Sequence, residues 1–206
     1  MIHKDYICTI LGRFEGKGVT RAYVPCEGGN YVGIGSWEGK KPYGASGVTI
    51  GTGFDLGQQS EGVLRALGLD PILQAKLAYY LGAKTQAAME KLCARPLVLT
   101  AEEVAALDEA VHEKYINETA VMFGSDRFSS APKQVQAVAV SLHYQFGVPA
   151  RSASPSLEKA WDAMREGRYA GGAAFLRDIS GWSLSHRQYM VRRRAEAALL
   201  DEAAVE

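Results

Sequence analysis

The chain changes character near residue 60, and this change limits its fold more than any other feature. More than half of its 22 glycines fall within residues 15–59, a segment without helical periodicity. Short apolar runs at 21–25, 31–34 and 48–50 are typical of strands, so this segment predicts a small, twisted antiparallel sheet. From residue 60 onward helical patterns follow one another without a second strand-rich block. We therefore predict an α+β protein rather than alternating β–α–β units.

Capping signals place the individual helices. Residues 5–14 have helical apolar spacing and predict an N-terminal helix. Further helices are expected to begin at Asp70-Pro71, at the capping box Thr100–Glu103, at Ser130-Ala-Pro132, at Ser154-Pro155 and near Ser185, the last ending near Leu200. A chain of 206 residues can bury one sizeable core. We expect a single domain over residues 1–206, with a sheet lobe at about 15–59, a helical lobe at about 60–206 and the helix 5–14.

Charge and cysteine content exclude several classes of protein. Lys and Arg together number 23, as do Asp and Glu, which argues against a nucleic-acid partner held by bulk electrostatics. Cys8, Cys26 and Cys93 have neither metal-ligand spacing nor the pattern of a disulfide framework, and we expect no cofactor and no metal. No apolar run approaches the ~18 residues of a membrane span, and no secretion signal is visible. We therefore expect synthesis in the cytoplasm, no membrane insertion and a monomer.

The segment GVTIGTGFDLG at 47–57 is the most unusual stretch of the chain. It superficially resembles a phosphate-binding loop, but the dinucleotide fingerprint needs a β–α–β unit, and Gly-Lys-Ser/Thr is absent. A scaffold that presents Thr49 and Asp55 is the better interpretation. These residues are six positions apart, so both side chains would share one face of a regular strand.

Three glutamates in the glycine-rich segment precede a glycine: Glu15, Glu27 and Glu38. A glycosidase needs a carboxylic acid that protonates the leaving oxygen and a second polar group that positions water. Glu15 ends the predicted first helix beside apolar residues, and partial burial suits a general acid. Glu27 and Glu38 fall in the 26–45 loop, where we expect solvated side chains, although either is an alternative catalytic or binding carboxylate.

The order of these motifs resembles the muramidase domain of pesticin-type bacterial toxins, which is itself related to phage-type lysozymes. The resemblance covers nearly the whole chain and rests on FEG at 14–16, AYVP at 22–25, SGVTIGTGFDLG at 46–57, YYLG at 79–82, PL at 96–97, LHYQFG at 142–147 and RRRAE at 192–196. It implies a lysozyme-like fold with a cleft between a small sheet lobe and a larger helical lobe. It also implies cleavage of the β-1,4 bond between N-acetylmuramic acid and N-acetylglucosamine in peptidoglycan.

The resemblance also implies roles for individual residues. Glu15 would be the general acid, Thr49 would position the attacking water, and Asp55 would assist that water or the developing charge. Space for a water opposite the acid favours inversion of the anomeric carbon. The remaining substrate-binding residues would be Tyr23, Gln145 and Arg192. Trp182 could stack on sugar, but we expect it in the core.

Two alternatives from other classes remain open. One is a catalytically inactive, peptidoglycan-binding module of lysozyme-like fold. The other is a cell-wall cysteine amidase, in which Cys26 would pair with His112, His143 or His186. For the muramidase we expect action in the periplasm or on the wall, as an endolysin, a type VI secretion effector or a bacteriocin domain. An effector or bacteriocin would have a secretion carrier or a periplasmic immunity protein as a partner.

Overall fold

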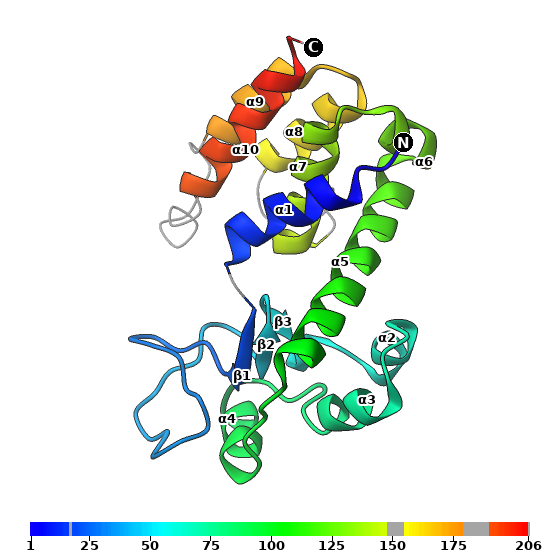
Figure 1. The fold of residues 1–206 in the computed structure, drawn as a ribbon. Helices are drawn as coiled ribbons and strands as arrows, with labels where there is room; N and C mark the ends of the chain where they lie inside the picture. Colours follow the sequence, from blue (N-terminus) through cyan, green and yellow to red (C-terminus); the bar gives the residue numbers. More distant parts are fainter. Residues whose placement is uncertain (17, 148–154, 179–189, 206) are drawn as a thin grey trace. The chain divides into compact units, whose positions relative to one another are not determined.

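A computed structural model describes residues 1–16, 18–147, 155–178 and 190–205. The chain forms two compact units (Figure 1). We call residues 15–114 the sheet unit, and residues 1–14 together with 115–206 the helical unit. The first helix and the long α5 each contribute to both units. The boundary therefore lies within α5 rather than near residue 60, and the expected single domain stays a prediction.

The described elements follow the expected α+β order. The helices are α1 (Lys4–Glu15), α2 (Glu61–Ala66), α3 (Pro71–Ala78), α4 (Thr85–Ala94), α5 (Ala101–Phe123), α6 (Ser125–Ser130), α7 (Lys133–Phe146), α8 (Pro155–Arg165), α9 (Tyr169–Arg177) and α10 (Met190–Ala203). The strands are β1 (Val19–Tyr23), β2 (Thr49–Gly51) and β3 (Phe54–Asp55), followed by a short 3-10 helix, η1 (Leu56–Gln58). The α+β prediction is confirmed.

The sheet is antiparallel, with strand order β1-β2-β3. The prediction of a strand at 31–34 is wrong, since Tyr31 makes only an isolated bridge with Val24. Gly33 and Gly35 explain the difference, because their φ angles of 76° and 73° cannot continue an extended strand. The Tyr31 ring is nevertheless buried, and its hydroxyl donates to the Gly35 carbonyl at 3.2 Å.

The capping predictions are confirmed in the sheet unit. Thr100 N–H donates to Glu103 Oε2 at 2.9 Å, and Glu103 N–H donates to Thr100 Oγ1 at 3.2 Å. This reciprocal pair is a capping box at the start of α5. Asp70 Oδ1 accepts from Ile72 N–H at 2.8 Å, with Pro71 as the first residue of α3.

The core of the helical unit is built around α7, in which every residue from 134 to 143 is buried. Helix α9 packs on α8 and on α10, and α10 also contacts α7; Figure 1 draws α9 and α10 side by side. Helix α8 begins at Pro155, as expected from its sequence, and ends at Arg165, two residues before Gly167 with its φ of 75°. Trp182 and the expected helix start near Ser185 lie outside the described residues. Among the helices that are described, none has the length and apolar character needed to cross a membrane.

Candidate active site

Glu15 is the last residue of α1 and is half-buried. Gly16 follows it with a φ of 81°, which lets the chain leave the helix sharply. Glu15 faces the turn between β2 and β3: a Cβ added to Gly53 would lie 3.8 Å from Glu15 Oε2. Gly53 is exposed and has a φ of 95°. Bare backbone therefore lies beside the carboxylate, which leaves room for a ligand.

Tyr23, Thr49 and Asp55 form a row across the three strands. Tyr23 pairs with Thr49, and Thr49 pairs with Asp55. Cross-strand partners project to the same face of a sheet, so the three side chains are neighbours. The expected shared face of Thr49 and Asp55 is confirmed, although for a different reason. The strand does not continue between them but folds back at residues 51–53.

Hydrogen bonds within 47–57 fix this row. The Thr49 hydroxyl donates to the Gly47 carbonyl at 3.3 Å. The Asp55 carboxylate accepts from Gly47 N–H, at 3.2 Å to Oδ1 and 3.1 Å to Oδ2, and from Gly57 N–H at 2.8 Å. A Cβ on Gly47 would lie 2.6 Å from Asp55 Oδ1, so only glycine permits this approach. Asp55 therefore closes the segment into a compact loop as well as facing the row.

The negative charges of Glu15 and Asp55 both act on the Tyr23 phenol. Burial, then Glu15, then Asp55 raise the pKa of the Tyr23 phenol. Each effect disfavours the phenolate, so the hydroxyl stays protonated at neutral pH and can donate a hydrogen bond. The structure thus brings together four of the six predicted site residues, Glu15, Tyr23, Thr49 and Asp55, within the sheet unit.

Gln145 and Arg192 belong to the helical unit, where they join a buried polar cluster between α7 and α10. Gln145 Oε1 accepts from Arg193 Nη2 at 2.7 Å. Arg192 donates to Ser141 Oγ at 2.9 Å from Nη2, and its guanidinium lies 5.0 Å from the centre of the Phe14 ring. These contacts tie α10 to α7. A part for Gln145 and Arg192 in binding sugar stays a prediction.

Glu196 is the fully buried acid of this cluster. Its Oε1 accepts from Ser141 Oγ at 2.5 Å and from Arg193 Nη2 at 2.6 Å. Burial raises the pKa of Glu196, and the two neighbouring arginines and Ser141 act in the opposite direction. Glu196 was recognised in the sequence only as part of the motif at 192–196, because nothing in its spacing indicates burial.

Two polar residues of α5 were not predicted in this place: Asp108 was not a candidate, and His112 was expected only in the cysteine alternative. Asp108 Oδ1 accepts from the Thr52 N–H at 2.9 Å and from the Thr52 hydroxyl at 3.0 Å. The same hydroxyl lies 3.5 Å from His112 Nε2. Burial lowers the pKa of His112, against the opposing charges of Asp108 and Glu15. Asp108 and His112 of α5 thus lie at the turn of residues 51–53, beside Glu15.

The alternative site residues lack the surroundings that their chemistry requires. Glu27 and Glu38 are exposed, without the partial burial that suits a general acid. Cys26 is 1% exposed, its Sγ lies 3.4 Å from the Val24 carbonyl oxygen, and burial raises the pKa of its thiol. A nucleophilic cysteine needs an accessible thiolate, so the structure disfavours Cys26 in that role. Within the described ranges, no group of three His, Cys, Asp or Glu residues could hold a metal ion.

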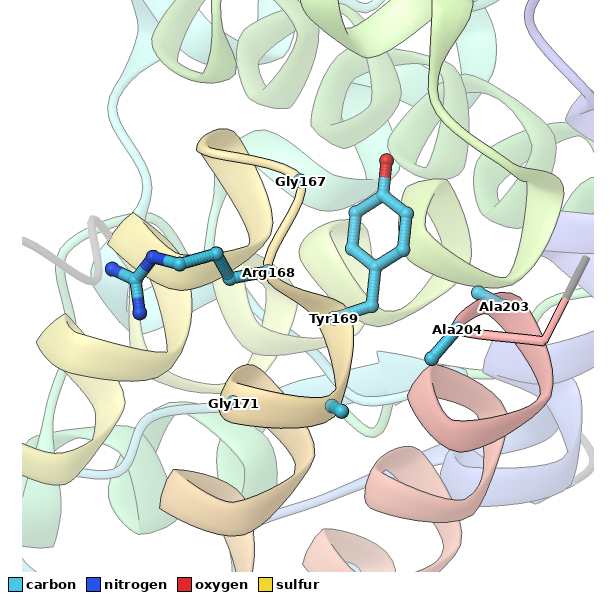
Figure 2. A pocket seen from close by; sticks show the side chains of 7 residues that line it. Gly167, Arg168, Tyr169, Gly171, Ala203 and Ala204 are labelled. Carbon is cyan, nitrogen blue, oxygen red and sulfur yellow. The ribbon is translucent and has the colours of Figure 1, made fainter.

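One open pocket of about 430 Å³ lies in the helical unit, at the turn from α8 to α9 and the end of α10. Figure 2 shows the Tyr169 ring beside Ala203 and Ala204, while Arg168 extends away from them. Arg168 already donates from Nε to Glu166 at 2.8 Å. None of the predicted site residues lines this pocket.

Comparisons with known proteins show the family of the chain. The search of curated proteins finds no match. A family model described as "Pesticin: Bacterial toxin homologue of phage lysozyme, C-term" matches residues 2–169. The matched span contains Glu15, Tyr23, Thr49, Asp55 and Gln145, and it ends before Arg192. Since the match covers most of the 206 residues, the chain belongs to the pesticin family of toxin domains related to phage lysozyme, and so to the lysozyme-like glycoside hydrolases.

Proposed function

We propose that the protein is an N-acetylmuramidase that cleaves the β-1,4 bond between N-acetylmuramic acid and N-acetylglucosamine of peptidoglycan. One observation carries this proposal: Glu15 and the row of Tyr23, Thr49 and Asp55 lie in one compact unit, within the span matched by the family model. Glycoside hydrolysis uses a pair of carboxyl groups at the scissile bond, and Glu15 and Asp55 supply two carboxyl groups in this unit.

Glu15 is the proposed general acid. Its proton passes to the glycosidic oxygen as the bond from that oxygen to the anomeric carbon of N-acetylmuramic acid breaks. The anomeric carbon then develops the positive charge of an oxocarbenium-like transition state. The open backbone at Gly53 supports this role, because it leaves the carboxyl accessible to a sugar.

Thr49 and Asp55 are proposed to position the attacking water. The Thr49 hydroxyl gives its hydrogen to the Gly47 carbonyl, so its oxygen can accept a hydrogen bond from water. Asp55 Oδ2 shares only the Gly47 N–H, which also contacts Oδ1, and it therefore keeps an acceptor site. The water loses its proton to Asp55 and attacks the face of the sugar opposite Glu15.

This mechanism inverts the anomeric configuration. Proton NMR of the first-formed product distinguishes inversion from retention, and a retained anomer would contradict the assignment of water to Thr49 and Asp55. Tyr23 is proposed to bind the substrate, since its protonated phenol can donate a hydrogen bond to a sugar oxygen.

The proposed setting is bacteriolysis, as a toxin, an effector or an endolysin. Peptidoglycan lies outside the cytoplasm, so the enzyme acts in the periplasm or on the wall after delivery. An immunity protein or a secretion carrier is the proposed partner if the protein is an effector or a bacteriocin.

The test is digestion of isolated peptidoglycan by the wild type and Glu15→Gln, with mass spectrometry of the released muropeptides. General acid catalysis contributes roughly 10²–10⁴-fold, so Glu15→Gln should lose activity by that factor. Glu27→Gln and Glu38→Gln are matched controls on exposed glutamates of the same unit, and both should retain activity. Activity in Glu15→Gln close to the wild-type level would remove Glu15 from the role of acid.

Two outcomes would favour the alternatives. Wild-type protein that binds peptidoglycan without releasing muropeptides would be a binding module. Release of stem peptides that is lost in Cys26→Ala would indicate the cysteine amidase. Under the proposed function, Cys26→Ala retains activity and the products have cleaved glycan strands.

A further inference from the structure

One face of α5 brings polar groups to the turn at residues 51–53 that the proposed mechanism does not use. Asp108 and His112 are four residues apart, so they lie on the same face of the helix. Both contact Thr52, which is only 7% exposed. A buried threonine held between an acid and a histidine, next to the proposed general acid, calls for a functional explanation.

The hydrogens in this group can be assigned. An ionised carboxylate only accepts hydrogen bonds, so the Thr52 hydroxyl gives its single hydrogen to Asp108 Oδ1. In the contact with His112 Nε2 the hydroxyl oxygen must then accept, and Nε2 must carry the hydrogen. Because burial lowers the pKa of His112, the ring is neutral at neutral pH and Nε2–H is its tautomer. The order of donation is therefore from His112 to Thr52 to Asp108.

Close packing makes this arrangement rigid. A Cβ added to Gly18 would lie 2.6 Å from Asp108 Oδ2, and one added to Gly51 would come closer than 3.0 Å to Asp108 Oδ1. Gly18, just before β1, and Gly51, at the end of β2, thus admit the Asp108 carboxylate. Thr52 lies between Gly51 and Gly53, whose φ angles are 63° and 95°. Glycines resist backbone motion poorly, so the turn is held by Thr52, through its N–H and its hydroxyl.

We propose that Asp108 and His112 are positioning residues for Glu15, which act by holding Thr52 and, through it, the turn at 51–53 against the Glu15 carboxylate. The turn lies close to the acid, since a Cβ added to Gly53 would lie 3.8 Å from Glu15 Oε2 and the charge of Glu15 acts on His112. A displaced turn would let the carboxyl rotate away from the glycosidic oxygen. A misplacement of about 1 Å can reduce turnover about 10²-fold. The proposal rests on Glu15 being the general acid of the proposed function.

Matched pairs of variants test whether Thr52 and His112 position Glu15. Thr52→Val keeps the shape but removes the hydroxyl, while Thr52→Ser keeps the hydroxyl. His112→Leu removes the donor, while His112→Gln restores an N–H near the position of Nε2. Glu109→Gln is the control, since Glu109 is an exposed acid next to Asp108 on α5. Turnover and KM are measured on soluble, uncross-linked glycan strands, and thermal unfolding verifies the fold of each variant.

We expect Thr52→Val and His112→Leu to lower kcat roughly 10–100-fold with KM within about twofold. Thr52→Ser, His112→Gln and Glu109→Gln should stay within about threefold of wild type. Wild-type turnover in folded Thr52→Val or His112→Leu would overturn the proposal. If Thr52→Val does not fold, the His112 pair decides.

A second measurement separates this proposal from the proposed function. Glutamate labelled with ¹³C at the carboxyl carbon gives an NMR resonance for Glu15, which is assigned from its loss in Glu15→Gln. At a fixed pH the chemical shift of this resonance should change in Thr52→Val, because the surroundings of the carboxyl change. It should not change in Glu109→Gln. An unchanged chemical shift in Thr52→Val would overturn the positioning role, whereas an inactive wild type would overturn only the muramidase function.

Discussion

Gly51→Ala is the substitution whose effect follows most directly from the structure. Gly51 ends β2 with a φ of 63°, and an alanine there would have a left-handed conformation that costs about 1–2 kcal/mol. Its Cβ would also lie closer than 3.0 Å to Asp108 Oδ1. Asp108 would have to move and lose one of its two hydrogen bonds from Thr52, at roughly 1.5–3 kcal/mol for a bond to a charged group. The free energy of unfolding should fall by about 2.5–5 kcal/mol in total.

Urea denaturation measures this loss, and a double-mutant cycle with Asp108→Ala identifies its cause. In the Asp108→Ala background only the backbone strain remains, so Gly51→Ala should cost about 1–2 kcal/mol there. Gly12→Ala is the control, since Gly12 is an exposed helical glycine of α1 with no neighbouring atom within 4 Å. It should stabilise the protein by about 1 kcal/mol. An equal cost of Gly51→Ala in both backgrounds would refute the steric argument.

Three further predictions concern the polar residues. Glu196→Gln leaves Arg193 buried beside a neutral amide and should lower the free energy of unfolding by about 3–5 kcal/mol. The same substitution at the exposed Glu202 should change it by less than about 0.5 kcal/mol. Urea denaturation compares the two variants. Because burial lowers the pKa of His112 below its ordinary 6.5, the unfolded chain takes up a proton that the folded chain resists, and stability should fall as the pH drops below 6.5. Denaturation at several pH values should show a smaller fall in His112→Gln, and an identical fall would contradict the assignment. Tyr23→Phe should raise KM on glycan strands with kcat nearly unchanged, and a selective loss of kcat would instead make the phenol part of the chemistry.

The local features of this protein could be predicted because they depend on residues close together in the chain. The cap at Thr100 needs Glu103 only three positions later, and the helix start at Asp70 needs only the proline that follows. Glycine content likewise indicated the sheet segment. It did not reveal which apolar runs become strands, because the conformations of Gly33 and Gly35 decide that at 31–34.

The candidate site was predicted in part. Glu15, Thr49 and Asp55 were recognised from the order of their motifs, and the even spacing of the latter two indicated a shared face. Sequence alone could not show that the two are cross-strand partners, or that the Asp55 carboxylate binds the backbone of Gly47 and Gly57. Those contacts exist because the chain turns back at residues 51–53.

By itself the sequence determined the class of fold, the helix caps and the identity of the acidic and hydroxyl groups. Only the tertiary structure decided that Asp108 and His112 meet Thr52, from positions 56 and 60 residues further along the chain. The physical reason is that burial of the apolar side of α5 selects which of its polar residues face the sheet. Val104, Leu107 and Val111 are buried, and Asp108 and His112 accompany them to the turn beside Glu15.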